Sequence, residues 1–246
     1  MATRLIWMTP GSEKLITYIA RVSNPVGQLR QEHPRQLEER RLERQEEQLS
    51  EITQQDTRLV KYLIKNHHWS PFEMVNMCVE INTTRAISAQ ILRHRSFSFQ
   101  EFSQRYADVD ALIGEGGETQ FLSHSFDLRR QDTKNRQNSI DDIPDEIKES
   151  FYSRITELNK QTHDLYKDML NSGIAKECAR GILPLNTPTR LYMNGTLRSW
   201  IHYLHLRSSN GTQKEHSQIA KSIISTIIKK ELPLIYETCF NFSSNE

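Results

Sequence analysis

The chain has 246 residues, of which 36% are hydrophobic and 26% charged, and its formal net charge is +1 at pH 7. This length suits one domain around one core, so we expect residues 1–246 to form a single domain. The near-zero charge excludes a surface that attracts polyanions as a whole, so phosphate recognition has to be local. With no run of about 20 apolar residues and no secretory signal, the sequence predicts a cytoplasmic protein without a membrane partner.

Three cysteines, Cys78, Cys178 and Cys239, lie far apart and form no CxxC pair. Their odd number and wide spacing predict neither a disulfide framework nor a structural zinc site. We expect all three to be small core residues. The alternative for Cys178, a thiolate nucleophile, has no adjacent histidine to support it.

The N-terminal half begins with a strand expected at 4–8 and a helix expected from Ser12 to about Pro25. Between Pro34 and about Asn66, Glu and Arg recur three or four residues apart, which predicts one long, mostly solvated helix with a charged insertion at 34–58. A partner-binding helix is the alternative for this segment. Residues 75–82 alternate apolar and polar side chains, typical of a half-buried strand, and 83–95 return to helical spacing.

The C-terminal half begins with the polar stretch 108–142, which predicts a long loop with one short strand at 120–126. Residues 143–173 carry an apolar stripe and end at Gly173, typical of an amphipathic helix with a glycine C-cap. The stripe consists of Ile147, Phe151, Ile155, Leu158, Leu165 and Met169. We then expect a short helix at 175–183, a strand at 189–193, a turn at 194–195, a helix at 196–207 and a terminal helix at 215–240 interrupted near Pro233. This irregular order of strands and helices predicts an α+β fold with a central sheet flanked by helices.

The densest polar cluster runs from Gln90 to Tyr106 and contains Arg93, His94 and Arg95 in succession. If these residues continue a helix, Gln90 and Arg93 share a face and Arg95 points away, so the two arginines bind different ligands. Guanidinium groups match phosphate oxygens, and the neighbouring hydroxyl, amide and carboxyl groups suit sugars and base edges. The cluster therefore favours nucleotide binding. The alternative is that its cations only stabilise the C-terminus of a helix.

The sequence Arg93-His94-Arg95, followed by seven residues and Ser103, closely resembles the signature of flavin-dependent thymidylate synthases. The resemblance covers most of the chain. It continues through Arg105-Tyr106, residues 68–73 (HWSPFE), residues 177–186 (ECARGILPLN), Arg198-Ser199 and Leu206-Arg207. It implies a homotetrameric enzyme with active sites between subunits, which converts dUMP to dTMP with FAD, NADPH and methylenetetrahydrofolate and needs no metal, nucleic acid or catalytic cysteine.

The resemblance also implies roles for individual residues. Those expected to hold dUMP are Gln90, Arg93, Glu101, Ser103, Gln104, Arg105, Arg180 and Arg207. Those expected to contact FAD are His68, Ser70, Arg93, His94, Arg95, Glu101, Thr196, Leu197, Arg198 and His202. We expect Arg207 to be the catalytic residue, because a permanent positive charge against the pyrimidine stabilises negative charge that develops on the ring. The chain departs from the family pattern at Met74, where a histidine is frequent, and at Thr196 and His202, where asparagine is frequent.

Several alternatives stay open at this point. Ser103 could be a nucleophile, but without a nearby base we favour a ligand-binding hydroxyl. The alternatives to FAD contacts are a plain surface histidine for His68 and a core or boundary histidine for His202. Two other functions remain: a nucleic-acid-binding module in which residues 93–106 stack bases on Phe97, Phe99 and Phe102, and an inactive scaffold homologue. The order of one-carbon and hydride transfer and the choice between NADPH and NADH are also open.

Overall fold

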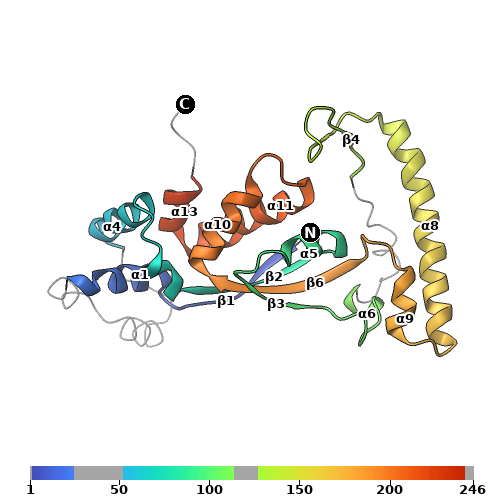
Figure 1. Cartoon of the computed structure of the whole chain (residues 1–246), viewed down its shortest axis with the longest axis horizontal. Helices are drawn as coiled ribbons and strands as arrows, with labels where there is room; N and C mark the ends of the chain where they lie inside the picture. Colours follow the sequence, from blue (N-terminus) through green and yellow to red (C-terminus); the bar gives the residue numbers. More distant parts are fainter. Residues whose placement is uncertain (1, 25–51, 114–126, 242–246) are drawn as a thin grey trace.

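The computed structural model in Figure 1 describes residues 2–24, 52–113 and 127–241. Its centre is a four-stranded antiparallel sheet with the strand order β1-β2-β6-β3. The strands are β1 (Ala2–Met8), β2 (Asn76–Thr84), β6 (Pro188–Thr196) and β3 (Ser98–Glu101). The two central strands pair along their whole length, from Asn76 opposite Thr196 to Thr84 opposite Pro188. Helices accompany this sheet, so the predicted α+β fold is confirmed.

The C-terminal helices pack on one face of the sheet (Figure 1). The helix α10 (Leu197–Ser208) follows β6 directly, and the side chain of its N-cap Thr196 accepts a hydrogen bond from the Ser199 N–H. Then come α11 (Lys214–Ile223), a π-helical turn η4 (Ile224–Ile228), α12 (Lys229–Glu231) and α13 (Pro233–Cys239). The break falls at Leu232, because the residue before a proline is pushed out of the helical region. The interruption predicted near Pro233 is confirmed.

The N-terminal helices are α1 (Ser12–Ala20), the 3-10 turn η1 (Arg21–Ser23), α4 (Gln54–Lys65) and the 3-10 turn η2 (Ser70–Met74). Thr53 and Asp56 form a reciprocal capping box that starts α4, and Thr53 has an extended backbone. The prediction of one continuous helix from 34 to 66 is therefore wrong. Residues 25–51, which include most of the charged segment 34–58, lie outside the described residues.

A second group of helices, which we call the arm, stands at one end of the sheet (Figure 1). The arm contains α6 (Asp110–Ile113), α8 (Asp145–Asn171), α9 (Lys176–Ala179) and the 3-10 turn η3 (Arg180–Ile182). The helix predicted at 143–173 is confirmed, with Gly173 at a left-handed φ of 80° just beyond α8. Within the predicted polar loop, β4 (Arg130–Gln131) and β5 (Ser139–Ile140) form a short antiparallel pair. The strand predicted at 120–126 lies outside the described residues.

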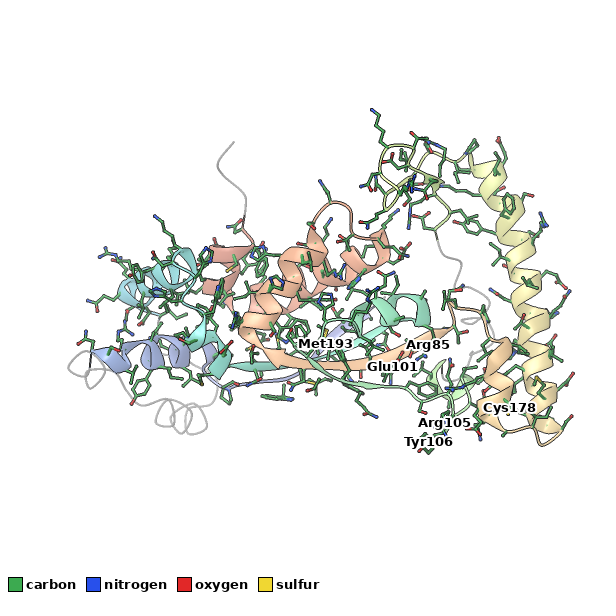
Figure 2. The ribbon with its side chains drawn as sticks, viewed as in Figure 1. Arg85, Glu101, Arg105, Tyr106, Cys178 and Met193 are labelled. Carbon is green, nitrogen blue, oxygen red and sulfur yellow. The ribbon has the colours of Figure 1, made fainter. Side chains whose placement is uncertain are left out.

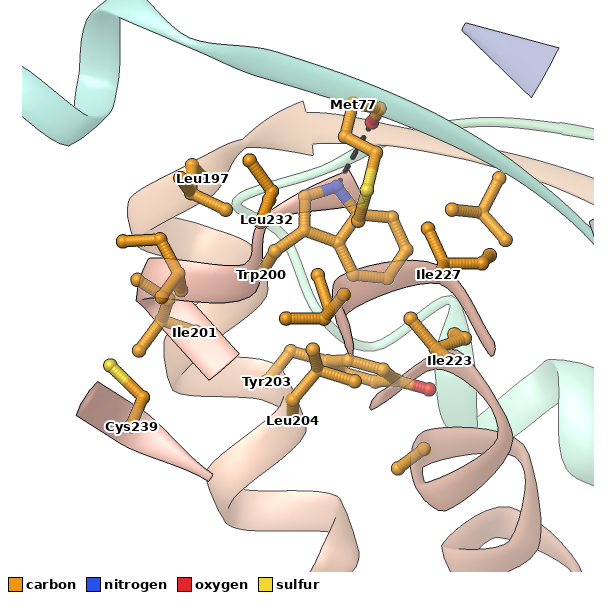
Figure 3. Packing of buried hydrophobic residues seen from close by; sticks show 14 of the residues in the cluster. Met77, Leu197, Trp200, Ile201, Tyr203, Leu204, Ile223, Ile227, Leu232 and Cys239 are labelled. Carbon is orange, nitrogen blue, oxygen red and sulfur yellow. Dashed lines mark hydrogen bonds between the residues drawn. The ribbon is translucent and has the colours of Figure 1, made fainter. Parts of the chain in front are cut away.

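The main core lies between the sheet and helices α10, α11 and α13. Figure 3 shows Trp200 at its centre, with the indole Nε1 donating to the Met77 carbonyl at 2.9 Å. Around it pack side chains that solvent does not reach, including Leu197, Tyr203 and Ile223. A tryptophan buried with its N–H satisfied contributes apolar area without the cost of an unpaired donor. This packing fixes α10 and α11 on the sheet.

The turn predicted at Asn194-Gly195 is wrong, because both residues lie inside β6. Gly195 pairs with Met77, and the ring of Phe97 occupies the space in which a Cβ at Gly195 would lie. The glycine therefore permits a close approach between strand and ring, and the strand continues to Thr196 instead of turning.

Two of the three cysteines, Cys78 and Cys239, are buried as predicted, but Cys178 is exposed. The prediction fails at Cys178 because α9 has only four residues and buries only Ala179. No helix within the described ranges is long and apolar enough to cross a membrane.

Candidate functional site

The three basic residues of the signature lie in a turn and not on a helix. The helix α5 (Arg85–Ile91) ends first, and the His94 N–H donates to the Ile91 carbonyl at 3.0 Å. Phe97 then enters the core, with its ring centroid 5.0 Å from that of Trp200. The helical phase expected for Gln90, Arg93 and Arg95 is therefore wrong, because burying Phe97 turns the chain out of the helix.

In this turn, His94 orients Arg207, which lies at the C-terminal end of α10. Arg207 Nε–H donates to His94 Nε2 at 2.9 Å, so this imidazole nitrogen carries no proton. Burial, together with smaller electrostatic contributions from Arg207 and His202, lowers the pKa of His94 to about 4. At neutral pH an uncharged imidazole thus holds the guanidinium and leaves its terminal N–H groups for a ligand.

Gln90 lies beside this pair, on α5. Its Nε2 donates to Gln213 Oε1 at 2.6 Å, and its Oε1 is 3.4 Å from Nδ1 of His216. The His216 ring centroid is 6.3 Å from that of His94. The structure therefore gathers three of the predicted site residues, Gln90, His94 and Arg207, which we call the Arg207 cluster.

Three neighbours of this cluster were not predicted from the sequence: Tyr203, Gln213 and His216. A signal existed for His216, because it precedes Ile219, Ala220 and Ile223 at helical spacing and so lies on the buried face of α11. A histidine on an apolar face needs a partner, and Tyr203 provides one at 3.0 Å.

Glu101, expected to contact both ligands, is held at the end of β3 by three neighbours. Its carboxylate accepts from Ser88 Oγ at 2.6 Å and Thr189 Oγ1 at 2.9 Å, and it pairs with Arg85 at 2.8 Å. Figure 2 shows Arg85 and Glu101 side by side along the sheet. This carboxylate therefore has a fixed orientation, set by three residues that the sequence did not single out.

Arg105 and Arg180, two of the residues expected to hold dUMP, lie on the side of the arm. Arg105 Nε–H donates to Glu177 at 3.1 Å, and Figure 2 shows Arg105 and Tyr106 near Cys178 on α9. Within the described ranges, Arg180 has no hydrogen bond or ion pair through its side chain. Gln104 is buried, and its Nε2 has no partner in the part of the chain that the structure describes. An unpartnered buried donor is costly, so this amide suits a ligand that completes its hydrogen bonds.

The residues expected only at FAD gather around η2 and the start of α10, apart from His94 and Arg95. His68 is exposed, with its ring edge-on to Tyr62 at 5.6 Å, and Arg198 pairs with Glu73. Ser70 is also exposed, whereas the Leu197 side chain lies in the core. His202 is exposed, so the alternative of a core or boundary histidine is wrong there.

One chain does not bring these groups together. Thr196 ends β6 and Arg198 follows it, whereas Arg180 precedes the other end of this nine-residue strand, which spans about 27 Å. Figure 1 likewise shows α9 beside α8, away from α10 and α11. The Arg207 cluster thus forms within one chain, whereas Arg180 lies at the opposite end of β6 from Thr196 and Arg198.

Two arginines of the signature are available to anions. Arg93 and Arg95 are exposed, and neither pairs with another side chain among the described residues. Free guanidinium groups in one turn fit the pyrophosphate of FAD. Across the described ranges no group of three His, Cys, Asp or Glu side chains could hold a metal ion.

Two alternatives lose support from this geometry. No hydrogen bond joins His94 to Ser103 within the described residues, so Ser103 lacks the base that a serine nucleophile needs. Base stacking requires exposed rings, but Phe97 is buried in the core, and Phe99 and Phe102 are only partly exposed.

A family model described as thymidylate synthase complementing protein matches residues 4–234. A flavin-dependent thymidylate synthase from Synechocystis sp. is 46% identical over 223 residues, which cover 91% of this chain and 87% of that protein. The chain belongs to the family of flavin-dependent thymidylate synthases. A probable flavin-dependent thymidylate synthase from Paramecium bursaria Chlorella virus 1 is also 46% identical, over 224 residues that cover 91% of this chain and 88% of that protein.

The fold agrees with this family assignment. A crystal structure of the UMP/dUMP methylase PolB from Streptomyces cacaoi, bound with 5-Br dUMP, has a TM-score of 0.72 and 22% identity to this chain. The match covers 96% of this chain and 93% of PolB. At this level of identity the likeness supports the fold of a flavin-dependent thymidylate synthase and leaves the site to the residues described above.

Proposed function

We propose that the chain converts dUMP to dTMP, with methylenetetrahydrofolate as the one-carbon donor and NADPH-reduced FAD as the hydride source. The observation that carries this proposal is Arg207 held by neutral His94 beside Gln90, in a chain 46% identical to flavin-dependent thymidylate synthases. The three side chains match the resemblance residue by residue. They also form a site in which the permanent positive charge of Arg207 has an orientation fixed by its hydrogen bond to His94.

We propose that arginine side chains and neighbouring polar groups recognise dUMP through charge and hydrogen bonds. Arg105 and Arg180 suit the dianionic monophosphate, because guanidinium groups form paired hydrogen bonds with phosphate oxygens. Arg207 against the pyrimidine edge stabilises negative charge on the ring, which makes C5 nucleophilic enough to take the one-carbon unit. Ser103 and Gln104 offer a hydroxyl and an unpartnered amide for the remaining polar groups of dUMP.

FAD supplies the hydride that completes the methyl group. The residues that we assign to holding it are His68, Ser70, Arg93, His94, Arg95, Glu101, Thr196, Leu197, Arg198 and His202. The exposed Arg93 and Arg95 suit the two phosphates. The His94–Arg207 hydrogen bond connects the turn that carries Arg93 and Arg95 to the Arg207 cluster. Residues assigned to FAD and residues assigned to dUMP are therefore in direct contact.

We further propose a homotetramer with active sites between subunits. Arg180 lies at the opposite end of β6 from Thr196 and Arg198 within one chain, and a second chain is a means of closing that gap. The arm offers an apolar surface for such a contact, because Phe151, Leu158 and Leu165 on α8 are about half exposed or more. We expect the neighbouring chain to bury this stripe.

The function is tested by measuring dTMP formation from dUMP with FAD, NADPH and methylenetetrahydrofolate, each omitted in turn. Arg207→Ala should retain bound FAD and lose most dUMP-dependent turnover, by about 100-fold or more, because one aimed charge in a site contributes a few kcal/mol. Arg58→Ala, at an exposed arginine on α4, is the matched control. An unimpaired Arg207→Ala rate would refute the catalytic assignment, and a purified wild-type protein that binds no flavin would refute the function.

The division of labour within the signature is tested separately. Arg95→Ala should weaken FAD retention by about 10-fold, the loss expected for one charge-assisted phosphate contact. Fluorescence titration of the apoprotein with FAD measures this affinity, with Arg58→Ala again as the control. Unchanged affinity would remove Arg95 from the cofactor site.

Sharing of sites between chains is tested by complementation. Arg180→Ala and Arg207→Ala should each be inactive alone. Co-expression of the two variants should restore about a quarter of wild-type activity, because in a randomly mixed symmetric oligomer about one site in four receives both intact arginines. No recovery in mixed oligomers of verified composition would locate both arginines in one chain's site.

A further inference from the structure

A chain of hydrogen bonds lies behind Gln90 and leads into the core. The Tyr203 hydroxyl is 3.0 Å from His216 Nε2, and His216 Nδ1 is 3.4 Å from Gln90 Oε1. Gln90 Nε2 then donates to Gln213 Oε1 at 2.6 Å. We call Tyr203, His216, Gln90 and Gln213 the His216 relay. It connects the aromatic core to an amide of the Arg207 cluster.

Burial fixes the charge state of the relay. His216 and Tyr203 are both fully buried. Burial, together with smaller electrostatic contributions from Arg207 and His94, lowers the pKa of His216 to about 3, while burial raises the pKa of Tyr203. At neutral pH the imidazole is therefore uncharged with a single N–H, and the phenol keeps its proton.

Which atom donates in each hydrogen bond of the relay follows from the Tyr203 hydroxyl at its buried end. If His216 carried its proton on Nε2, that N–H would donate to the Tyr203 oxygen, and the hydroxyl hydrogen of Tyr203 would have no acceptor among the described residues. Leaving a buried hydroxyl unpaired costs free energy, so Tyr203 donates to Nε2 and the proton lies on Nδ1. His216 Nδ1–H then donates to Gln90 Oε1, which directs the amide nitrogen of Gln90 to Gln213.

We propose that His216 is a positioning residue, which Tyr203 holds as the Nδ1–H tautomer and which sets the orientation of the Gln90 amide, and with it the places of the second lone pair and the second N–H that Gln90 offers to the nucleotide. This inference rests on the proposed function, in which Gln90 binds dUMP. The edge of uracil carries both hydrogen-bond donors and acceptors. An amide in the wrong orientation would therefore place its N–H group against a uracil N–H group. The relay fixes the orientation before the substrate arrives, and such preorganisation favours binding.

The tautomer is tested without substrate. Nitrogen-15 NMR of the imidazole rings of the full chain should show His216 protonated at Nδ1 and unprotonated at Nε2. Tyr203→Phe removes only the hydroxyl, so a fraction of His216 should shift its proton to Nε2. A wild-type ring that carries its proton on Nε2 would overturn the proposal, and this measurement stands even if the protein forms no dTMP.

The consequence for binding is tested by kinetics. A glutamine side chain reaches the Nε2 position of histidine and an asparagine side chain reaches Nδ1, so His216→Gln loses the donor to Gln90 whereas His216→Asn keeps one. We expect His216→Gln to raise the KM for dUMP about 3- to 10-fold with kcat within about twofold, as for one lost hydrogen bond. His216→Asn should recover part of this loss. Equal KM values for the wild type and His216→Gln would overturn the proposal, and Tyr203→Phe serves in the same assay if His216→Gln does not fold.

A double-mutant cycle separates positioning from general damage to the fold. If His216 acts through Gln90, then His216→Gln should add no further increase in KM to Gln90→Ala. Independent, multiplicative increases would show that His216 acts elsewhere and would overturn the inference. His205→Gln is the control on the neighbouring α10, since the His205 ring stacks on Phe240 at 4.8 Å.

Discussion

Apolar side chains are buried in one region of the molecule and exposed in another. The first region is the sheet with α10 and α11, and the second is the arm. Around the sheet, Trp200 and Ile223 are fully buried, and Trp200 also satisfies its N–H on Met77. In the arm, the apolar stripe predicted for α8 lies largely on the surface, with Leu158 62% exposed and Phe151 48% exposed. The side chains that α8 buries against its own chain are Asn159, His163 and Tyr166.

This difference shows that the apolar face of an amphipathic helix is either buried within its own chain or left exposed on the surface. The apolar faces of α10 and α11 are buried within the chain, so these helices carry a site whose parts already contact one another. The helix α8 contacts its own chain through Asn159, His163 and a small apolar cluster around Tyr166, and it leaves most of its apolar stripe exposed. An exposed apolar stripe is the arrangement expected of a surface that another molecule covers. We therefore expect substitutions near the sheet to change stability and substitutions on the stripe to change assembly.

The largest effect is expected at the centre of the core. Trp200→Ala should lower the free energy of unfolding by about 3–5 kcal/mol, because it leaves a cavity and removes the partner of the Met77 carbonyl. Urea titration followed by circular dichroism measures the change. Trp7→Ala is the control, because Trp7 is 47% exposed on β1. Equal losses at both positions would contradict a core centred on Trp200.

A pH-dependent effect is expected where α1 meets α13. The buried Glu13 carboxylate accepts the Ile235 N–H at 2.9 Å, and burial raises its pKa to about 7 although this hydrogen bond opposes the shift. The folded protein therefore holds this proton more tightly than the unfolded chain does. The stability that results is complete below pH 4.5 and is lost as the pH rises through 7.

Glu13→Gln should remove this slope and leave the variant more stable than the wild type at pH 8, by about 3 kcal/mol for a shift of this size. Thermal unfolding from pH 5 to pH 8 measures the difference. Glu237→Gln, at an exposed position on α13, should leave the slope unchanged. A wild-type protein equally stable at both ends of this range would show that Glu13 does not titrate there.

A smaller loss of stability is expected at Gly195. Gly195→Ala places a methyl group against the Phe97 ring, and the adjustment should cost about 1–3 kcal/mol. The matched control lies in the arm, because a Cβ at Gly181 meets no atom within 4 Å, so Gly181→Ala should change stability by less than about 0.5 kcal/mol. Chemical denaturation of the pair compares them, and a reversed order would contradict the tight packing of β6 on Phe97.

The smallest effect on the fold is expected on the stripe of α8. The double variant Phe151→Ser, Leu158→Ser removes exposed side chains, so the circular dichroism spectrum should be preserved while the oligomer dissociates. Light scattering after size-exclusion chromatography measures the mass. Lys160→Ser, an exposed polar position on the same helix, should keep the wild-type mass. An unchanged mass in the double variant would remove the stripe from the assembly.

Local patterns in the sequence were sufficient for much of the fold. Period-two alternation predicted β2, apolar spacing and Gly173 predicted α8, and Pro233 marked the break before α13, because each feature acts on the backbone within a few residues. The signature around Arg93 also identified the family, since it consists of consecutive residues. The capping pair Thr53 and Asp56 was present as well, but the charge periodicity around it favoured a longer helix.

Tertiary structure alone decided the rest. Asn194-Gly195 has the composition of a turn, yet pairing with β2 and the Phe97 ring keep it in a strand. The helix α5 ends at Ile91 and Phe97 packs on Trp200 in the core, so Arg93 and Arg95 lie in the turn between them. His216 lies 126 residues from Gln90 in the sequence, and only the folding of α11 onto α10 and the sheet brings the two together. Hydrogen bonds and burial between distant residues depend on the whole fold, so no local pattern encodes them.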